Sequence, residues 1–168
     1  IESRVIVLAE DVTAATLERM RIERERDYDL LTGLYNRRAF YRFAGRVFDQ
    51  PDKMKHAAMV MMDLDNLKRT NDTFGHEWGD RYIHEAAVCF LRSIPEETLC
   101  ARVSGDEFNI LFYGYDSREA VEQAIDRLIS GVENSCFNLP DGTATRIHVS
   151  GGIAWYPDDG TEMMELIK

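Results

Sequence analysis

The stretch that decides the fold reads Arg102-Val103-Ser104-Gly105-Asp106-Glu107-Phe108-Asn109-Ile110-Leu111-Phe112. Two apolar runs of strand-forming residues, 98–103 and 108–113, flank its short Ser-Gly-Asp-Glu turn, and this pattern predicts a β-hairpin. The two adjacent carboxylates at the tip repel each other, so both stay ionised only where something positive is near. A divalent cation, which prefers oxygen ligands, would serve. A solvated acidic turn is the alternative, and the hairpin alone leaves both open.

A second stretch also places carboxylates next to an apolar, strand-forming run. The apolar run 57–62 ends at Asp63-Leu64-Asp65, and a buried strand that delivers carboxylates at its end is a common way to build a metal and phosphate site. Asp63 and Asp65 are two residues apart, so within one strand they would share a face. Residues 66–80 then combine acids, bases, amides and glycines in a way that a simple core helix does not need. The two stretches together favour a ligand site over a solvated turn.

With these stretches in place, the chain resembles the GGDEF family of diguanylate cyclases. The resemblance runs in family order and spacing over about residues 28–168. The matching motifs are Asp29-Leu30-Leu31-Thr32-Gly33-Leu34-Tyr35-Asn36-Arg37-Arg38, Asp63-Leu64-Asp65-Asn66-Leu67-Lys68, Asn71-Asp72-Thr73-Phe74-Gly75-His76 with Gly79-Asp80, Ser104-Gly105-Asp106-Glu107-Phe108, and Val149-Ser150-Gly151-Gly152-Ile153-Ala154.

Composition narrows the class of protein further. A chain of 168 residues fits one domain plus an extension. Its net charge of −10 argues against general binding to nucleic acid or to anionic membranes, which requires a basic surface. Cys89, Cys100 and Cys136 lack metal-type spacing and are expected to be buried, reduced thiols. No run reaches transmembrane length, and the start at Ile1 rather than Met predicts a fragment of a longer protein.

The first 28 residues form a separate unit in this interpretation. Residues 4–9 read as a strand, and residues 13–28 as a helix whose sparse apolar positions cannot bury much alone. The pattern resembles the end of a PAS-type sensor domain followed by a signalling helix, with a plain N-terminal helix as the alternative. We expect residues 29–168 to be the catalytic domain, truncated in its last helix, and to lie in the cytoplasm as part of a larger multidomain or membrane-anchored sensor protein.

The periodicity of residues 29–168 predicts helices packed on a mostly antiparallel sheet, an α/β sandwich. Asn36 and Ser117 can cap helices, and Pro95 ends one. Leu30, Leu91 and Ile129 are predicted to point into the core. The resemblance implies the ferredoxin-like palm fold of nucleotidyl cyclases, here with an N-terminal helical extension.

The metal site is predicted partly from the positions of the carboxylates in the sequence and partly from the family resemblance. Asp63 at a strand end and Asp106 at the hairpin tip are well placed to hold Mg²⁺, or Mn²⁺ in its place. The resemblance adds the backbone carbonyl of Leu64. Glu107 is assigned to a second metal contact or to deprotonation of the attacking hydroxyl, and the identity of the base stays open. Asp65 is read as a helix cap or a solvated acid.

The resemblance implies that the substrate is GTP and the product cyclic di-GMP. Asn71 and Asp80 would read guanine, because a carboxylate and an amide match its edge whereas adenine would leave buried groups unpaired. The other implied substrate contacts are His76, Asn66, Leu67, Lys68, Gly105 and Lys168. One domain holds one GTP, so the product requires a homodimer that joins the catalytic faces and the N-terminal helices.

Two departures from the family pattern carry predictions. Ser104 stands where glycine is usual, and activity is expected to be retained because Gly105 keeps the more demanding position. Pro95 and Thr98 stand where many members have the Arg and Asp of a product-binding site, so no feedback through that site is predicted. A degenerate module that binds GTP or product without turnover is the alternative function, and a related palm enzyme for another nucleotide is disfavoured by Asn71 and Asp80.

Overall fold

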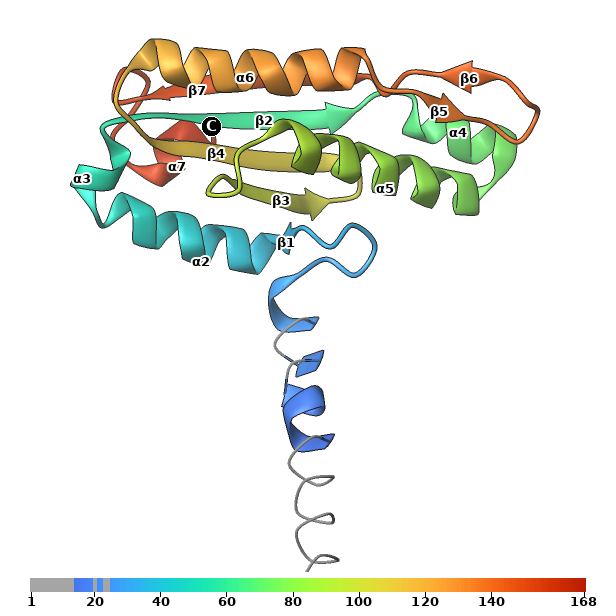
Figure 1. The fold of residues 1–168 in the computed structure, drawn as a ribbon, viewed down its shortest axis with the longest axis horizontal. Coiled ribbons are helices and arrows are strands. Elements are labelled where there is room, and N and C mark those ends of the chain that lie inside the picture. The colour runs from blue at the N-terminus through green and yellow to red at the C-terminus, as the bar shows by residue number, and fades with distance from the viewer. Residues whose placement is uncertain (1–13, 20, 23–24) are drawn as a thin grey trace, which may run out of the picture.

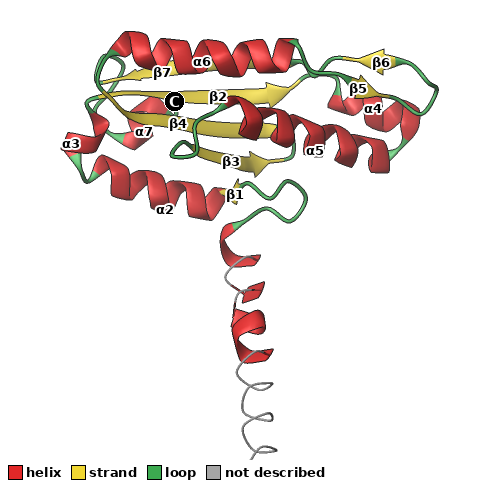
Figure 2. Cartoon of the chain, viewed as in Figure 1, coloured by secondary structure: helices red, strands yellow, loops and turns green. Residues whose placement is uncertain are grey.

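The computed structural model describes residues 14–19, 21–22 and 25–168. The strand predicted at residues 4–9 lies outside these described residues. The described residues after the stalk-like N-terminal helix fold around a five-stranded sheet with helices on both faces (Figures 1 and 2). The strands are β1 (Tyr35–Asn36), β2 (His56–Leu64), β3 (Leu99–Ser104), β4 (Glu107–Tyr115) and β7 (Val149–Tyr156), in the spatial order β1-β3-β4-β2-β7.

The sheet is mostly antiparallel, because only β1 pairs in parallel, with β3. The helices are α2 (Arg37–Phe48), α3 (Pro51–Met54), α4 (Leu67–Phe74), α5 (His76–Ser93), α6 (Arg118–Glu133) and α7 (Met163–Leu166), with a small hairpin of β5 (Phe137–Asn138) and β6 (Ala144–Thr145). Helices α5 and α6 cover one face of the sheet, and α2 and α7 pack on the other. The predicted α/β sandwich with a mostly antiparallel sheet is confirmed.

Local sequence sets the helix ends as predicted. The side chain of Asn36 accepts a hydrogen bond of 3.0 Å from the backbone N–H of Ala39 and caps α2. Ser117 caps α6 in the same way through the N–H of Ala120, at 3.2 Å. Helix α5 ends at Ser93, two residues before Pro95. These ends place the connecting loops at the two ends of the sheet.

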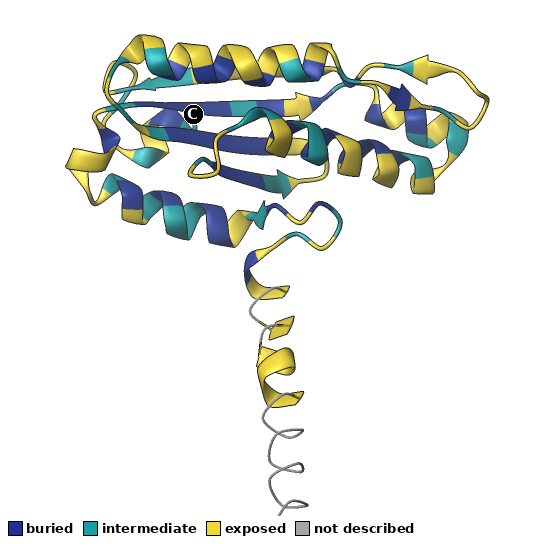
Figure 3. Ribbon diagram, in the orientation of Figure 1, coloured by how far each residue is buried: buried dark blue, intermediate teal, exposed yellow. Residues whose placement is uncertain are grey.

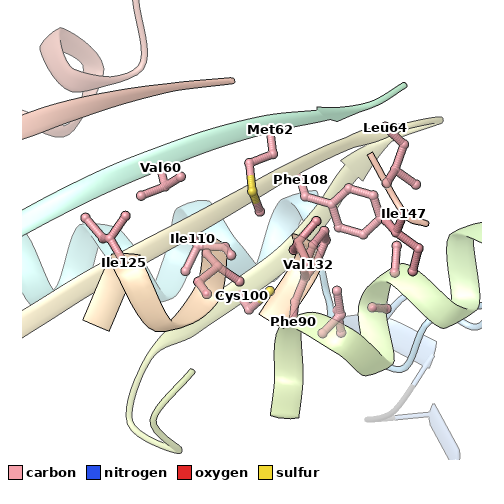
Figure 4. Close-up of a cluster of buried hydrophobic side chains, with 14 of the residues drawn as sticks. Val60, Met62, Leu64, Phe90, Cys100, Phe108, Ile110, Ile125, Val132 and Ile147 are labelled. Atoms are coloured by element: carbon pink, nitrogen blue, oxygen red, sulfur yellow. The ribbon is translucent and has the colours of Figure 1, made fainter. Parts of the chain in front are cut away.

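The core lies on both faces of the sheet, as the burial colours show (Figure 3). The larger cluster joins β2 and β4 to α5 and α6, and part of it is drawn in Figure 4. In its centre Phe90 of α5 meets Phe108 of β4 edge to face, with ring centroids 5.1 Å apart. The smaller cluster packs Phe40 of α2 and Leu166 of α7 against the opposite face. The strands are therefore held from both sides, which fixes where their ends lie.

Three core predictions are wrong. Leu30, Leu91 and Ile129 are 77%, 51% and 44% exposed, respectively. Leu30 lies in the turn that precedes β1, where Leu34 fills the core instead. Leu91 and Ile129 each follow a fully buried residue directly, so a step of about 100° around the helix carries them to the edge of the packed face.

The three cysteines are free thiols in different surroundings. Burial raises the pKa of Cys100 to about 12, so this thiol stays protonated. Cys89 is half-buried, whereas Cys136 is exposed in the loop between α6 and β5. The prediction of three buried thiols is therefore wrong for Cys136, which lies in a surface connection.

The described helical residues before Tyr28 project from the domain as a stalk (Figure 1). The end of the stalk is tied to α2 through Asp27, whose buried carboxylate lies 2.9 Å from Arg26 and 2.8 Å from Arg42. Hydrogen bonds from Arg26 and then Arg42 lower the pKa of Asp27 to about 2. The amide of Asn36 also donates to the carbonyl oxygen of Arg26 at 2.9 Å. None of the helices in the described ranges is both long and apolar enough to cross a bilayer.

Candidate functional site

The site begins where β2, β4 and β7 come together at one end of the sheet. Asp63, near the end of β2, lies opposite Glu107 on β4 and opposite Ser150 on β7. Residues opposite one another in an antiparallel sheet share a face, so these three side chains form one polar row. The backbone N–H of Leu64 donates to the carbonyl oxygen of Asp106 at 3.0 Å. The predicted ligands Asp63, Leu64, Asp106 and Glu107 are thus brought to one edge of the sheet.

The hairpin tip between β3 and β4 has a defined conformation. Gly105 has a φ of +33°, which a residue with a side chain rarely adopts. Its carbonyl oxygen accepts a hydrogen bond of 2.8 Å from Nε of Arg102. The hydroxyl of Ser104 donates to Oε2 of Glu107 at 2.6 Å. Gly105 thus keeps the demanding backbone position, as predicted, and Ser104 fits beside it without positive φ.

Negative charge is concentrated at this edge. Asp63 is exposed, and its pKa is raised, first because the strand end partly desolvates the carboxylate and further because Asp106, Glu107 and Asp65 repel its charge. A bound cation would remove this repulsion. The oxygen-only donor set suits Mg²⁺ or Mn²⁺.

The carboxylates are nevertheless not assembled into a closed ligand shell. In the part of the chain that the structure describes, no group of three or more His, Cys, Asp or Glu side chains is arranged as a metal site. The chemistry of the donor set fits a hard cation, and the positions of the donors leave the coordination incomplete.

Asp65 lies just beyond the end of β2, so it does not continue the face of Asp63 as a strand residue would. Its carboxylate accepts from the hydroxyl of Ser150 at 2.9 Å, and its N–H donates to the carbonyl of His148 at 3.0 Å. The predicted cap role is wrong, because the residue preceding α4 is Asn66 and that helix has no side-chain cap. Asp65 instead ties the end of β2 to the start of β7.

The predicted base-reading residues lie on α4 and α5, which pack against each other. The side-chain oxygen of Asn71 on α4 is buried and has no hydrogen-bond partner in the described part of the chain. A Cβ at Gly79 would come within 1.8 Å of this oxygen, so only glycine allows the close approach of the two helices. Asp80 is exposed and lines a hollow of about 720 Å³ together with Leu31 and Trp78. His76 is exposed at the first residue of α5.

The predicted phosphate-binding residues fall on two elements. Asn66 precedes α4 with a φ of +65°, Leu67 is buried, and Lys68 is exposed. Lys168 is exposed after α7, on the other face of the sheet. Its neighbour Ile167 lines a groove that also contains Asp63.

That groove, of about 430 Å³, contains residues that the sequence interpretation did not include in the site. Asn109 lies two residues beyond Glu107 on β4, and therefore on the same face. Arg37 and Tyr41 of α2 line the groove as well. The period of two along β4 could have indicated Asn109, whereas nothing in the sequence places α2 beside the acidic row.

These features define an α/β domain of the nucleotidyl cyclase type, with an acidic strand end beside a glycine-containing hairpin. The family described as "Diguanylate cyclase, GGDEF domain" matches residues 26–168. The chain belongs to the GGDEF family.

Solved structures with the same fold include members of this family. A sensory box/GGDEF family protein from Caulobacter crescentus is 29% identical, with a TM-score of 0.73 over 84% of this chain and 90% of that one. The GGDEF domain of DgcB from the same organism, solved in complex with c-di-GMP, is 26% identical with a TM-score of 0.68 over 80% and 81% of the two chains.

Among curated proteins, an "Uncharacterized membrane protein" of Staphylococcus aureus strain USA300 is 30% identical over 163 residues. The match covers 94% of this chain and 46% of that protein, so the chain spans about half the length of the curated relatives it matches.

Proposed function

We propose that the protein is a diguanylate cyclase that condenses two GTP molecules into cyclic di-GMP and two pyrophosphates. The observation that carries this proposal is the register of β2 and β4, which sets Asp63 opposite Glu107 beside the Asp106 hairpin tip. Membership of the GGDEF family supports it.

The reaction joins each 3′-hydroxyl to the α-phosphorus of the other GTP. The hydroxyl oxygen attacks, the bond from the α-phosphorus to its bridging oxygen breaks, and pyrophosphate leaves opposite the new bond. The hydroxyl proton passes to a base. A second transfer with the two nucleotides exchanged closes the ring. We assign Glu107 to assisting the removal of the proton, with Asp63 and Asp106 balancing the charge of the phosphates through a cation.

Mg²⁺ or Mn²⁺ would be held by Asp63, Asp106 and the carbonyl of Leu64, and when bound it neutralises the phosphates and polarises the reacting phosphorus. The protein supplies the rigid strand end and hairpin that hold these oxygens. The backbone N–H groups at the start of α4, near Asn66 and Leu67, would bind phosphate oxygens because helix N-termini favour anions.

Guanine recognition is assigned to Asn71 and Asp80. The unpartnered amide oxygen of Asn71 can accept a hydrogen bond from guanine, and the Asp80 carboxylate can accept others. Adenine would leave these acceptors unpaired, which costs about 1–3 kcal/mol for the buried oxygen of Asn71. His76, Lys68, Gly105 and Lys168 complete the proposed set of substrate contacts.

The product requires two domains face to face, so we propose a homodimer. The stalk supports this proposal, because Leu17 and Ile22, two apolar side chains in its described residues, are exposed. A second stalk would cover them and set the distance between the two catalytic faces. An upstream sensor domain acting through the stalk would then control the reaction from the cytoplasmic side of a membrane, where GTP is available. Product feedback through Pro95 and Thr98 is not expected, since neither side chain carries charge.

One observation favours the alternative of a binding module without turnover. The hydroxyl of Ser104 donates to Glu107 at 2.6 Å and holds the carboxylate against the hairpin. Glycine at this position would leave Glu107 without this bond.

The experiment incubates the purified protein with GTP and Mg²⁺, and separately with ATP. Chromatography and mass spectrometry identify the product. Cyclic di-GMP from GTP alone, absent with an Asp106→Ala, Glu107→Ala double variant, is expected. GTP bound and recovered unchanged would support the binding module instead.

A further inference from the structure

Another cavity lies between α4 and the small hairpin of β5 and β6 (Figure 1). Its volume of about 390 Å³ falls within the range of small-molecule pockets, about 300–1,000 Å³. It shares no lining residue with the groove that contains Asp63 or with the hollow that contains Asp80. Asn66 is the one residue of the proposed substrate set that lines it, so the cyclase reaction leaves the rest of this cavity without a role.

The β5–β6 hairpin forms a well-anchored wall of the cavity. Phe137 of β5 is buried and meets the ring of Tyr82 edge to face, with centroids 5.3 Å apart. The N–H of Leu139 donates to the carbonyl oxygen of Thr143 at 2.8 Å and closes the turn. Oδ1 of Asp141 accepts from the N–H and the hydroxyl of Thr143, at 2.9 and 2.6 Å. Within the described residues, Oδ2 of Asp141 keeps its capacity to accept a hydrogen bond.

The buried residue Tyr82 of α5 also lines the cavity. Its hydroxyl oxygen accepts a hydrogen bond of 3.0 Å from the backbone N–H of His148. Burial raises the pKa of Tyr82, so the hydroxyl keeps its proton at neutral pH. A tyrosine hydroxyl can donate as well as accept, and in the described part of the chain Tyr82 donates to no other residue. The cavity therefore offers a hydrogen-bond donor from its buried side.

The exposed lining carries one charge of each sign. Arg69 of α4 and Asp141 of the hairpin both line the cavity, and both are exposed. They form no ion pair with each other or with any other residue that the structure describes. Two opposite charges on one cavity that do not pair with each other can bind a molecule that carries both signs. The half-buried side chains of Phe74 and Leu139 add apolar surface to the same lining.

We propose that this cavity binds a free α-amino acid with an apolar side chain. Arg69 binds the carboxylate through paired N–H groups, and Oδ2 of Asp141 accepts from the ammonium group. The apolar side chain of the ligand packs against Phe74 and Leu139. A nucleotide fits less well, because Asp141 repels phosphate and Arg69 is the one permanent cation among the lining residues. The site does not depend on the proposed cyclase function.

The test measures binding to the purified protein by calorimetry. The probes are L-leucine and two analogues of it. The first, 4-methylpentanoate, lacks the ammonium group, and the second, 3-methylbutylamine, lacks the carboxylate. We expect L-leucine to bind at least about tenfold more tightly than either analogue, because each analogue loses one charged hydrogen bond.

Two variants separate the contributions of the two charges. Arg69→Gln should weaken binding of L-leucine about tenfold and leave 3-methylbutylamine within about twofold, since this amine has no carboxylate to lose. Asp141→Asn keeps Oδ1 for Thr143, and it should weaken L-leucine about tenfold while 4-methylpentanoate stays within about twofold. The control is Arg92→Gln, which changes an exposed arginine of α5 outside the cavity and should leave all three affinities within about twofold.

Equal affinities of Arg69→Gln and Arg92→Gln for L-leucine would overturn the site. Failure of the wild-type protein to bind L-leucine, L-methionine and L-valine at millimolar concentrations would overturn it as well. Binding of inorganic phosphate in their place, lost in Arg69→Gln, would replace the amino acid with a simple anion and contradict the proposal. Each of these results leaves the cyclase function untouched, because Asp63 and Asp106 lie outside the cavity.

Discussion

Nη1 of Arg102 lies 3.3 Å from Oδ1 of Asp29, a contact between residues 73 positions apart in the sequence. The same guanidinium donates through Nε to the carbonyl oxygen of Gly105. Asp29 in turn accepts from the N–H and the hydroxyl of Thr32. The turn that follows the stalk and the hairpin that carries Asp106 are therefore held to each other by one arginine.

Replacing this arginine should affect activity more than folding. Arg102→Ala removes both ties, and a catalytic group displaced by about 1 Å can lose on the order of 100-fold in rate. We expect cyclase turnover to fall about 10- to 100-fold and Tm to fall by a few degrees. Arg127→Ala, an exposed arginine on α6, is the control. Equal turnover in the two variants would contradict the role of Arg102.

Gly79→Ala tests the contact between α4 and α5. The added Cβ would meet Oδ1 of Asn71 at 1.8 Å and must displace it. We expect the affinity for GTP to fall at least about tenfold, since a misplaced amide loses its hydrogen bond to guanine. Gly45→Ala in α2 is the control, because its Cβ would meet nothing within 4 Å and should stabilise the helix by about 1 kcal/mol. Calorimetric titration with GTP that gives equal affinities for both variants would refute the assignment of Asn71.

The link between stalk and domain should depend on pH through Asp27. The pKa of this carboxyl falls from its usual 3.8 to about 2 in the folded protein. Its stabilising effect is therefore complete above pH 4 and is lost as the pH falls toward 2. We expect Asp27→Asn to lower Tm by roughly 2–6 °C at pH 7, and by progressively less between pH 4 and pH 2. A difference in Tm that stays constant down to pH 2 would show that the charge of Asp27 is not involved.

Ser104 should restrain Glu107. Ser104→Gly and Ser104→Ala both remove the hydroxyl that donates to the carboxylate. Turnover is expected to rise about two- to tenfold in both, a small part of the roughly 100-fold or more that proton-transfer catalysis contributes. Ser104→Thr retains a hydroxyl and should resemble the wild type. Initial rates at saturating GTP distinguish the variants, and equal rates in all four proteins would show that the bond does not limit Glu107.

The sequence predicted the sheet and the position of its acidic edge because both follow from local pattern. The run 57–62 and the two strands of the hairpin 98–113 have strand periodicity, and carboxylates stand at the end of the run, at Asp63, and at the tip of the hairpin, at Asp106. The helix caps at Asn36 and Ser117 could be predicted for the same reason. Each cap depends on one hydrogen bond, which the backbone N–H three residues further along the chain donates to the capping side chain.

The contacts that the sequence did not predict are those between distant elements. Arg37 reaches the groove only because α2 packs on the same face of the sheet as Glu107, and Arg102 finds Asp29 only after the sheet has formed. The exposure of Leu91 and Ile129 has a similar origin, because the breadth of a buried helix face depends on the neighbour that covers it.

The most direct test of the central claim is the rate of pyrophosphate release from GTP at several protein concentrations, with product counted in the same samples. A dimeric cyclase predicts two pyrophosphates for each cyclic di-GMP and a rate that rises more steeply than the protein concentration. It also predicts that the Asp106→Ala, Glu107→Ala double variant releases no pyrophosphate and forms no cyclic di-GMP at any protein concentration. GTP that binds but releases no pyrophosphate at any protein concentration would contradict the claim.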